Sequence, residues 1–382
     1  MLIGIDARAL EEPQTGVGRY LANLLENWAL FSSEQNSLSK NRFVLYFKNS
    51  IPSRGILESS CFIKKTVKAP FTIKSNALFQ HCFLPRQAKK DRIDILFSPS
   101  YLLPICYSGK TAVTIHDISF EIFPQNLSPA DKFLLKKMSR ISAKNADVIF
   151  TVSEFSKKEI SGRYGISADK IFVTPLGADE KFFAAKNGEN IQAIQEKFGI
   201  KGKLVLSIGT IFNRRHTDAL IGAFAPFGQK FSQYQLLVIG KNHTYPFIDM
   251  DKKIREVNRA LKRNAVLRCD SVSSDDLLAL YGAAEALVYL SDYEGFGLPP
   301  LEAAASGIPV ITSDIPAIRE NMADAAVFVK NNMDLAEISR AMEVVATDNA
   351  IRNNLIEKGL ARAKMFSWRE CAKKTLAVLE KI

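Results

Sequence analysis

The chain has 382 residues, of which 47% are hydrophobic and 24% charged, and its 51 Lys and Arg against 40 Asp and Glu give a net charge of +11. This composition excludes a disordered chain and fits a folded protein of two ordinary-sized domains. No run approaches the roughly 18 consecutive apolar residues of a membrane-spanning helix, and the opening Met-Leu-Ile-Gly-Ile-Asp lacks the features of a secretory signal. We therefore expect a cytoplasmic protein.

Positive charge gathers in one segment. Residues 42–92 hold 11 basic and 2 acidic side chains. A solvated face would explain this bias, and so would contact with an anionic membrane surface or a phosphate-bearing acceptor. No motif typical of nucleic-acid binding is present, so we expect no nucleic-acid partner.

Cysteine and histidine are not arranged for metal binding. The five cysteines are scattered, at positions 61, 82, 106, 269 and 371, and the four histidines lie at positions 81, 116, 216 and 243. No pair has the spacing of zinc ligands, so we expect reduced thiols and no metal site.

Short apolar runs alternate with longer amphipathic stretches along the chain. In the first half they predict strands at Leu2–Ile5, Phe43–Phe47, Ile93–Phe97, Ala112–Ile115, Val148–Val152 and Ile171–Thr174. After residue 200 they predict strands at Leu204–Ile208, Leu236–Ile239, Ala286–Tyr289, Val310–Thr312 and Ala326–Val329. This rhythm predicts an α/β protein with two doubly wound parallel sheets.

Segment 175–190, with one Pro and two Gly among polar residues, predicts a hinge between the two series. We expect an N-terminal domain over residues 1–180, a C-terminal domain over 181–366 and a last helix over 367–382. Ligands of open α/β sheets bind beyond the carboxyl ends of the strands, so those ends are where a site is expected.

The most informative strand end follows Ala286–Tyr289, where residues 294–302 read Glu-Gly-Phe-Gly-Leu-Pro-Pro-Leu-Glu. The two adjacent prolines suit the first turn of a helix, so we predict a helix that starts near Leu298 or Pro299. A helix N-terminus after a glycine-rich turn presents free amides and partial positive charge. We therefore expect a diphosphate over Gly297 and Leu298.

Two carboxylates flank this turn. Glu294 precedes the predicted helix and Glu302 is expected in its first turn, so both can face one cleft. Carboxylates accept hydrogen bonds from the paired hydroxyls of a sugar or a ribose. The alternative is that Glu302 only complements the helix dipole.

Residues 294–302 strongly resemble the E-x7-E motif of the retaining glycosyltransferases of family 4, and the likeness extends through residues 303–313. The resemblance implies the GT-B fold, in which two Rossmann-like domains face each other across a cleft. The first domain would bind the acceptor and the second the nucleotide sugar, and the last helix would cross back to the first domain. The resemblance also implies that Glu302 binds the nucleotide ribose and Glu294 the donor sugar, beside the backbone amides of Gly295, Phe296, Gly297 and Leu298.

Two arginines follow the predicted strand Leu204–Ile208. Arg214 and Arg215 stand where the family usually has Arg-Lys, so positive charge is retained. Paired guanidiniums suit a diphosphate, whereas adjacent arginines on a loop are also often simply solvated. From the resemblance, we expect both to hold the donor diphosphate and to stabilise it as it leaves.

Residues 15–20, Thr-Gly-Val-Gly-Arg-Tyr, open a predicted helix that runs to about Trp28. A lone G-x-G is weak as a motif. Beside the first-strand residues Ile-Asp-Ala-Arg, the segment resembles the family's first glycine loop. The resemblance implies that the amides of Gly16 and Gly18 approach the phosphate and sugar of the donor.

His116 and Asp117 end the predicted strand Ala112–Ile115. A lone histidine at a strand end is usually structural. The surrounding segment, however, resembles the His-Asp segment of the family, which implies that His116 faces the donor sugar. Asp117 is then its expected orienting partner.

Asp249-Met-Asp251 has the D-x-D form with which another glycosyltransferase fold holds Mn²⁺ or Mg²⁺. Acidic residues are ordinary at a helix start, and a helical pattern follows directly, so we interpret this tripeptide as a helix start. The GT-B resemblance implies catalysis without a metal ion and with no cofactor besides the nucleotide-sugar substrate.

The family segments look most like mannosyltransferases that assemble bacterial polysaccharides such as O-antigen. We expect GDP-mannose as donor and a lipid-linked oligosaccharide or growing surface glycan as acceptor, with residues 42–92 meeting the inner face of the plasma membrane. No covalent nucleophile emerges, so we favour a same-face displacement.

Three alternatives stay open. The first is a transferase of this fold that uses a UDP-sugar or another nucleotide sugar, and the second is a sugar-nucleotide epimerase or hydrolase. The third is a glycan- or phosphate-binding protein without activity, against which the presence of both glutamates and both arginines speaks.

Overall fold

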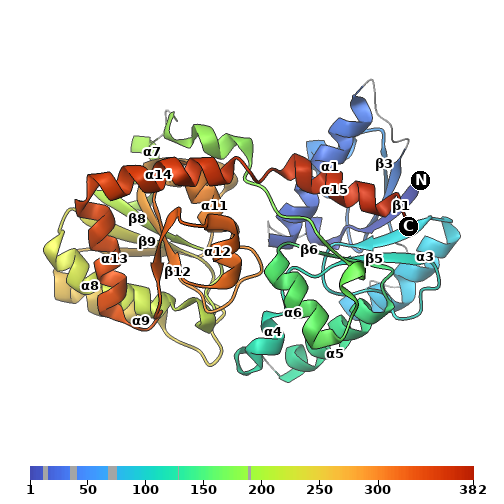
Figure 1. Ribbon diagram of the computed structural model, residues 1–382, viewed down its shortest axis with the longest axis horizontal. Helices are drawn as coiled ribbons and strands as arrows, with labels where there is room; N and C mark the ends of the chain where they lie inside the picture. Colours follow the sequence, from blue (N-terminus) through green and yellow to red (C-terminus); the bar gives the residue numbers. More distant parts are fainter. Residues whose placement is uncertain (12–15, 35–40, 68–74, 128, 188–190) are drawn as a thin grey trace. The chain divides into compact units, whose positions relative to one another are not determined.

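The computed structural model describes residues 1–11, 16–34, 41–67, 75–127, 129–187 and 191–382 (Figure 1). The chain divides into two compact units. The N-terminal unit comprises Met1–Glu121, Pro129–Leu176 and Trp368–Ile382, and the C-terminal unit comprises Ile122–Ser128 and Gly177–Ser367. The chain therefore passes between the units at more than one point.

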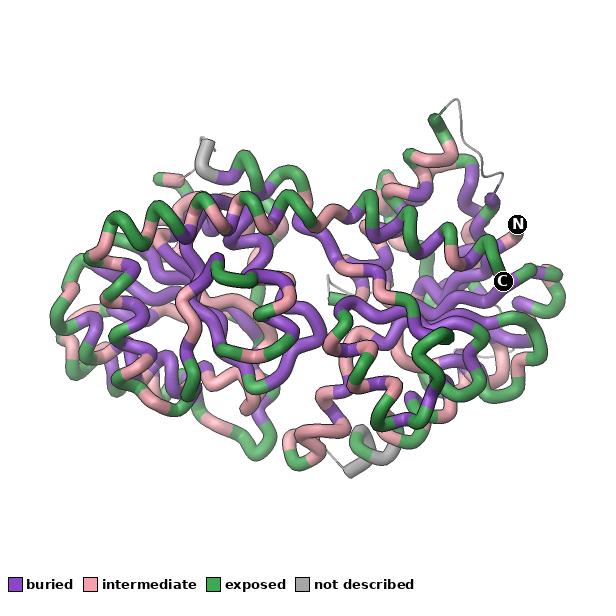
Figure 2. The backbone as a smooth tube through the Cα atoms, viewed as in Figure 1, coloured by how far each residue is buried: buried purple, intermediate pink, exposed green. Residues whose placement is uncertain are grey.

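The N-terminal unit is built on a seven-stranded parallel sheet with the strand order β3-β2-β1-β4-β5-β6-β7. Its strands are β1 (Leu2–Asp6), β2 (Arg42–Phe47), β3 (Phe62–Thr66), β4 (Ile95–Ser98), β5 (Lys110–Thr114), β6 (Val148–Thr151) and β7 (Ile171–Val173). The central strands are buried almost throughout, as expected of a parallel sheet covered on both faces (Figure 2).

The helices of this unit connect its strands, and the last one comes from the C-terminus of the chain. They are α1 (Gly16–Ser33), α2 (Asn76–Leu78), α3 (Leu84–Lys90), α4 (Ser119–Ile122), α5 (Pro129–Asn145), α6 (Glu154–Tyr164) and α15 (Trp368–Leu379). Helix α15 lies beside α1 (Figure 1), where the indole Nε1 of Trp28 donates to the carbonyl oxygen of Ala372 at 2.9 Å. The C-terminal helix is therefore part of the core of the N-terminal unit.

The C-terminal unit contains a six-stranded parallel sheet with the order β10-β9-β8-β11-β12-β13. Its strands are β8 (Lys203–Ile208), β9 (Tyr234–Ile239), β10 (Val266–Cys269), β11 (Ala284–Tyr289), β12 (Val310–Ser313) and β13 (Ala326–Val329). Its helices are α7 (Ile191–Phe198), α8 (Thr217–Lys230), α9 (Met250–Leu261), α10 (Ser274–Ala283), α11 (Leu298–Ala305), α12 (Pro316–Met322), α13 (Leu335–Thr347) and α14 (Asn349–Ala363).

Helices α8, α9 and α13 cover one face of this second sheet. Their apolar side chains form one cluster with alternate strand residues such as Val205, Leu236 and Val238. Successive strand residues point to opposite faces, so Leu204 and Leu206 are directed to the face on which α10 and α11 pack. Burial on both faces stabilises the strands and fixes where their carboxyl ends lie.

All eleven predicted strands form, with ends displaced by at most two residues. The prediction of two doubly wound parallel sheets is confirmed, but β3 and β10 were not predicted. Both are edge strands, and charged residues interrupt their apolar pattern. The helix after the first strand ends at Ser33 and not near Trp28. Among the described residues, no helix combines the length and apolar content needed to cross a bilayer.

Candidate functional site

Two loops meet at the carboxyl edge of the second sheet. Strands β8 and β11 are hydrogen-bonded neighbours, so the segments that follow them, residues 209–216 and 290–297, leave the sheet side by side. The first ends in a short 3-10 turn, Asn213–Arg215. The sequence-predicted arginines and Glu294 therefore share one edge of the sheet.

Glu294 holds both arginines. Its Oε1 lies 2.7 Å from Nη1 of Arg214 and 3.0 Å from Nε of Arg215. The three side chains are largely buried, with 8%, 11% and 16% of their surfaces exposed, respectively. Burial by itself would raise the pKa of Glu294, but the two guanidiniums outweigh it and lower that pKa to about 2. The cluster is ionised at neutral pH and carries one net positive charge.

The position of the Arg215 side chain depends on Gly209, the residue that follows β8. The φ angle of Gly209 is +129°, and a Cβ atom there would lie 2.4 Å from Nη1 of Arg215. That guanidinium donates to the carbonyl oxygen of Thr210 at 3.0 Å and lies over the ring of Tyr289. Glycine is thus required both for the backbone conformation and for the approach of the guanidinium.

Arg214 ties the two loops together. Its Nη1 donates to Oγ of Ser291 and to the carbonyl oxygen of Tyr293, in addition to Glu294. The backbone amide of Asp292 donates to the carbonyl oxygen of Arg214 at 2.9 Å. Nε and Nη2 of Arg214 have no partner within the described part of the chain, which leaves donors for a ligand.

A second pair supports this arrangement and was not predicted. Nε2 of His216 lies 2.7 Å from Oδ2 of Asp292, and Asn332 donates to Oδ1 of the same carboxylate. Burial tends to raise the pKa of Asp292, but the contacts with His216 and Asn332 lower it overall. His216 directly follows Arg215, and Asp292 lies shortly before Glu294. The contact between His216 and Asp292 therefore joins the two loops that position the arginines and the glutamate.

Helix α11 begins at Leu298, as predicted, with prolines in its first turn. Gly297 precedes it with a φ of +90°, and a Cβ there would lie 2.1 Å from Cδ1 of Ile318. Only glycine fits this cap. Pro299 and Pro300 have no N–H, and the amide of Leu301 donates to the carbonyl oxygen of Gly297, so the amide of Leu298 is the one in this turn that remains available for an anion.

The prediction that Glu302 lies in the first turn of α11 is wrong, because it lies in the second turn. A carboxylate there is too far along the helix to be explained by the N-terminal dipole alone, since that effect falls off within the first turn. The side chain is buried, and the hydroxyl of Tyr281 donates to its Oε2 at 3.2 Å. The buried carboxylate is therefore satisfied by a side-chain hydrogen bond and not by the helix terminus.

Phe296 contributes packing. Its buried ring lies edge-on to Phe366 at 5.7 Å, and its carbonyl oxygen accepts from the side chain of Asn321. The adjoining Gly295 is also buried. Any contact of Phe296 with a ligand would therefore come from its backbone.

In the N-terminal unit, His116 lies beyond the carboxyl end of β5. Its Nε2 donates to the carbonyl oxygen of Pro99 at 2.9 Å, and its ring meets that of Tyr20 edge-on at 4.8 Å. Burial lowers the pKa of His116, so the ring is neutral. Because a carbonyl only accepts, Nε2 carries the proton and Nδ1 is left as an acceptor.

Asp117 does not orient the histidine through a hydrogen bond, contrary to expectation. Its Oδ1 accepts from the amide of Ser119 at the start of α4, and the hydrogen bond from the histidine is accepted by the carbonyl oxygen of Pro99 instead. Gly16 and Gly18 lie in the first turn of α1, where Gly16 is exposed and Gly18 buried. Thr15, which precedes them, lies outside the described residues.

The D-x-D tripeptide forms a helix start, as predicted. Asp249 caps α9 by accepting from the amide of Lys252, and Asp251 pairs with Arg268 at 3.1 Å. Across the described ranges, no group of three or more His, Cys, Asp or Glu side chains is placed to hold a metal ion. All five cysteines are free thiols.

Two family models match the chain. One, described as glycosyl transferases group 1, covers residues 190–362, and the other, described as glycosyltransferase family 4, covers residues 63–182. This chain is a glycosyltransferase with the GT-B fold. It is 28% identical to the O-antigen chain mannosyltransferase B of Escherichia coli over 96% of both chains. It is also 30% identical to the O-antigen chain mannosyltransferase RfbU of Salmonella typhimurium, over 57% of this chain and 56% of that one.

Solved structures agree on the fold of this glycosyltransferase. WaaG, a glycosyltransferase involved in lipopolysaccharide biosynthesis, matches over 99% of both chains with a TM-score of 0.74 at 15% identity. Sucrose-phosphate synthase from Thermosynechococcus elongatus matches over 100% of this chain and 98% of its own, with a TM-score of 0.74 at 19% identity. At these identities the likeness concerns the fold alone.

Proposed function

We propose that this glycosyltransferase transfers mannose from GDP-mannose, with retention of configuration, to a lipid-linked oligosaccharide or growing surface polysaccharide. The observation that carries the proposal is the similarity to an O-antigen chain mannosyltransferase along 96% of both chains. In this proposal the donor is a nucleotide sugar and the acceptor is a glycan. The polar groups at the strand ends are suited to the phosphates of the first and to the hydroxyls of both.

In this proposal the C-terminal unit binds the donor. Arg214 and Arg215 hold the diphosphate, supported by the net positive charge of their cluster with Glu294. The backbone amides of residues 295–298 approach the sugar and the diphosphate. Glu302 accepts from the ribose hydroxyls, and Glu294, ionised because of its low pKa, accepts from hydroxyls of the mannose.

The N-terminal unit binds the acceptor in this proposal, and three of its residues also meet the donor. Gly16 and Gly18 present the start of α1 to the phosphate and sugar. His116 offers its unprotonated Nδ1 to a sugar hydroxyl, since its proton lies on Nε2, which donates to the carbonyl oxygen of Pro99. Because the imidazole is uncharged, its Nδ1 can accept a hydrogen bond from a hydroxyl of an uncharged sugar.

The proposed step is a same-face displacement. The bond between the anomeric carbon and the diphosphate oxygen breaks while the bond to the acceptor oxygen forms on the same face, and the acceptor proton passes to the departing diphosphate. The two arginines stabilise the negative charge that develops on the leaving group. No metal ion is required in this proposal, because the guanidiniums supply the positive charge.

The first experiment is a donor panel. GDP-, UDP-, ADP- and dTDP-sugars are incubated with the protein, and thermal stabilisation and nucleoside diphosphate release are followed with and without bacterial lipid extract. Stabilisation by GDP-mannose with extract-dependent GDP release is expected. Stabilisation by another nucleotide sugar would replace the donor, release without extract would favour a hydrolase or epimerase, and binding without turnover would favour a binding protein.

We also propose that the basic segment 42–92 meets an anionic membrane. Lys64 and Lys65 pair with Glu58 and Asp91. Exposed basic side chains without a partner in the described part of this segment are Arg42, Arg86, Lys89, Lys90 and Arg92, while Lys68 and Lys74 lie outside the described residues. The free cations on and after α3 support an electrostatic contact with anionic headgroups.

Vesicle sedimentation tests this contact. Binding to vesicles with anionic lipid should fall as salt rises, and the double variant Lys89→Glu with Lys90→Glu should bind less than the wild type. The matched control changes Lys373 and Lys374, two exposed lysines on α15, to Glu. Binding that is insensitive to salt, or equal losses in both variants, would remove the role of the segment.

A further inference from the structure

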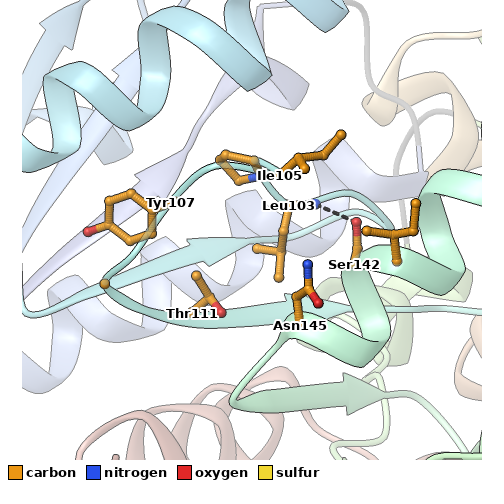
Figure 3. A pocket seen from close by; sticks show the side chains of 9 residues that line it. Leu103, Ile105, Tyr107, Thr111, Ser142 and Asn145 are labelled. Carbon is orange, nitrogen blue, oxygen red and sulfur yellow. Dashed lines mark hydrogen bonds between the residues drawn. The ribbon is translucent and has the colours of Figure 1, made fainter.

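A cavity of about 200 Å³ lies in the N-terminal unit, apart from the residues considered so far. It is formed by the loop of residues 99–109 between β4 and β5, by the start of β5 and by the last turns of α5 (Figure 3). Its lining residues are Leu103, Pro104, Ile105, Tyr107, Gly109, Thr111, Ile141, Ser142 and Asn145. None of these side chains is charged.

The loop connects this cavity with His116. At its beginning the carbonyl oxygen of Pro99 accepts from Nε2 of His116, beyond the carboxyl end of β5. Further along, the amide of Leu103 donates to Oγ of Ser142 at 2.9 Å, and the loop then returns to the amino end of β5. Because β5 has five residues, the two places are about 16 Å apart along the strand.

The walls of the cavity differ in chemistry (Figure 3). The loop contributes the apolar side chains of Leu103 and Ile105 and the ring of Tyr107, and α5 adds the apolar Ile141, whereas the polar groups of Thr111, Ser142 and Asn145 come from β5 and α5. The lining is therefore partly apolar and partly polar.

Several polar atoms of the cavity are available to a ligand. Ser142 is 3% exposed, and although its oxygen accepts from Leu103, its proton has no acceptor among the residues that the structure describes. Within the same described part, the carboxamide of Asn145 and the hydroxyl of Tyr107 have no hydrogen-bond partner. Burial raises the pKa of Tyr107, so its hydroxyl remains protonated and can donate.

We propose that this cavity binds a neutral hexose unit of the acceptor glycan, internal to the unit that receives the new sugar. A pyranose ring has apolar C–H faces and a rim of hydroxyls, which matches an uncharged lining that is partly apolar and partly polar. A phosphate would lose hydration without meeting a cation there. An acyl chain would leave the proton of the buried Ser142 hydroxyl without an acceptor.

The inference rests on the proposed glycan acceptor and adds where that acceptor is held. A short acceptor reaches only the site of transfer, whereas a longer one also fills the cavity. Once the glycan is long enough to reach both places, its contact with the cavity forms within a molecule that is already bound at the site of transfer. The affinity for such a glycan is therefore higher. The cavity therefore favours elongation of chains that are already several units long.

A binding test uses Cys106, an exposed free thiol between Ile105 and Tyr107. In the full-length protein without donor, mannotetraose should slow alkylation of Cys106, measured by mass spectrometry, while the rates at Cys82 and Cys269 serve as internal references. Equal alkylation with and without mannotetraose would overturn the proposal. Stronger protection by pyrophosphate or by a decyl chain would overturn it as well, since the cavity would then take an anion or a lipid.

A kinetic test compares acceptor lengths. In Asn145→Ala and Tyr107→Leu the KM for mannotetraose should rise about ten-fold, which corresponds to the loss of one good contact, with kcat unchanged and the KM for methyl mannoside unaffected. Asn354→Ala, an exposed change on α14, is the matched control. Wild-type KM values that do not depend on acceptor length contradict the inference.

These readouts separate the inference from the proposed function. If GDP-mannose is not turned over with any acceptor, the proposed function fails, but protection of Cys106 still decides whether the cavity binds a hexose unit. If turnover occurs and Cys106 is not protected, the function stands and the cavity site is wrong.

Discussion

Nη1 of Arg214 lies 2.7 Å from Oε1 of Glu294 and donates at the same time to Ser291 and Tyr293. Nε of Arg215 reaches the same carboxylate oxygen at 3.0 Å. One carboxylate on the loop after β11 thus holds two guanidiniums on the loop after β8. The structure of both loops, and the proposed grip on the donor diphosphate, depend on this contact.

Glu294→Gln should impair both turnover and folding. The amide leaves two buried guanidiniums with less compensation, and it accepts more weakly from a sugar hydroxyl. We expect kcat to fall by about 10²–10³-fold and the free energy of unfolding to fall by about 3 kcal/mol, as the lowered pKa of the carboxyl implies. Steady-state kinetics and denaturant unfolding measure the two effects.

Glu357→Gln is the control for this variant, since Glu357 is exposed on α14. It should leave both quantities unchanged within about 0.5 kcal/mol. Full activity in Glu294→Gln would refute the proposed role of the carboxylate in donor binding.

The low pKa of Glu294 also predicts a pH dependence. Its pKa falls from the ordinary 4.5 in the unfolded chain to about 2 in the folded one. The folded state therefore binds fewer protons, and the stabilisation is complete above the unfolded pKa and is lost as the pH falls through the folded one. The difference in unfolding free energy between the wild type and Glu294→Gln should shrink between pH 4.5 and 2, and a constant difference would contradict this assignment.

Gly297→Ala should destabilise the turn before α11. The φ angle is +90°, and the new methyl would lie 2.1 Å from Cδ1 of Ile318, so we expect a loss of about 2–4 kcal/mol in unfolding free energy. Gly162→Ala in α6, where a methyl meets nothing within 4 Å, should instead gain about 0.5–1 kcal/mol. Thermal unfolding of both variants checks the contrast, which similar effects would disprove.

The sequence predicts the strands that are apolar along their whole length. Buried central strands such as β9 are identified by continuous apolar runs, because both of their faces pack against helices. Strand β3 escapes this pattern since it carries Lys64 and Lys65, and β10 since it carries Arg268. As edge strands, both form through pairing with a neighbour, which a local pattern does not contain.

The site shows the same division between local and distant information. Glycine, proline and glutamate at residues 294–302 predict the turn and the start of α11, because these effects act within a few residues. The contact of His216 with Asp292 joins residues 76 positions apart and has no local signal. Likewise, no sequence pattern shows that the carbonyl oxygen of Pro99, and not the adjacent Asp117, accepts the hydrogen bond from His116.

His216→Ala should weaken the positioning of the arginines. The change removes the contact with Asp292 but touches neither guanidinium nor Glu294. We expect kcat to fall about ten-fold because misplacement of groups costs catalysis even where the groups themselves are intact. His216→Asn, which keeps a donor, should recover part of the loss, and equal kinetics in both variants would show that the donor is unimportant.

His116 links burial to both stability and turnover. Burial lowers its pKa from the ordinary 6.5, so below that pH the unfolded chain takes up a proton that the folded chain does not. Stability is therefore complete above pH 6.5 and declines as the pH falls towards the folded pKa, and His116→Gln should remove this part of the decline.

The same variant should lower kcat about 10²-fold at pH 8, where stability is little changed, if Nδ1 meets the donor sugar as proposed. Unfolding titrations from pH 8 to 5, run beside kinetics at pH 8, separate the two effects, and unaltered kcat would reduce His116 to a packing residue between Tyr20 and Pro99.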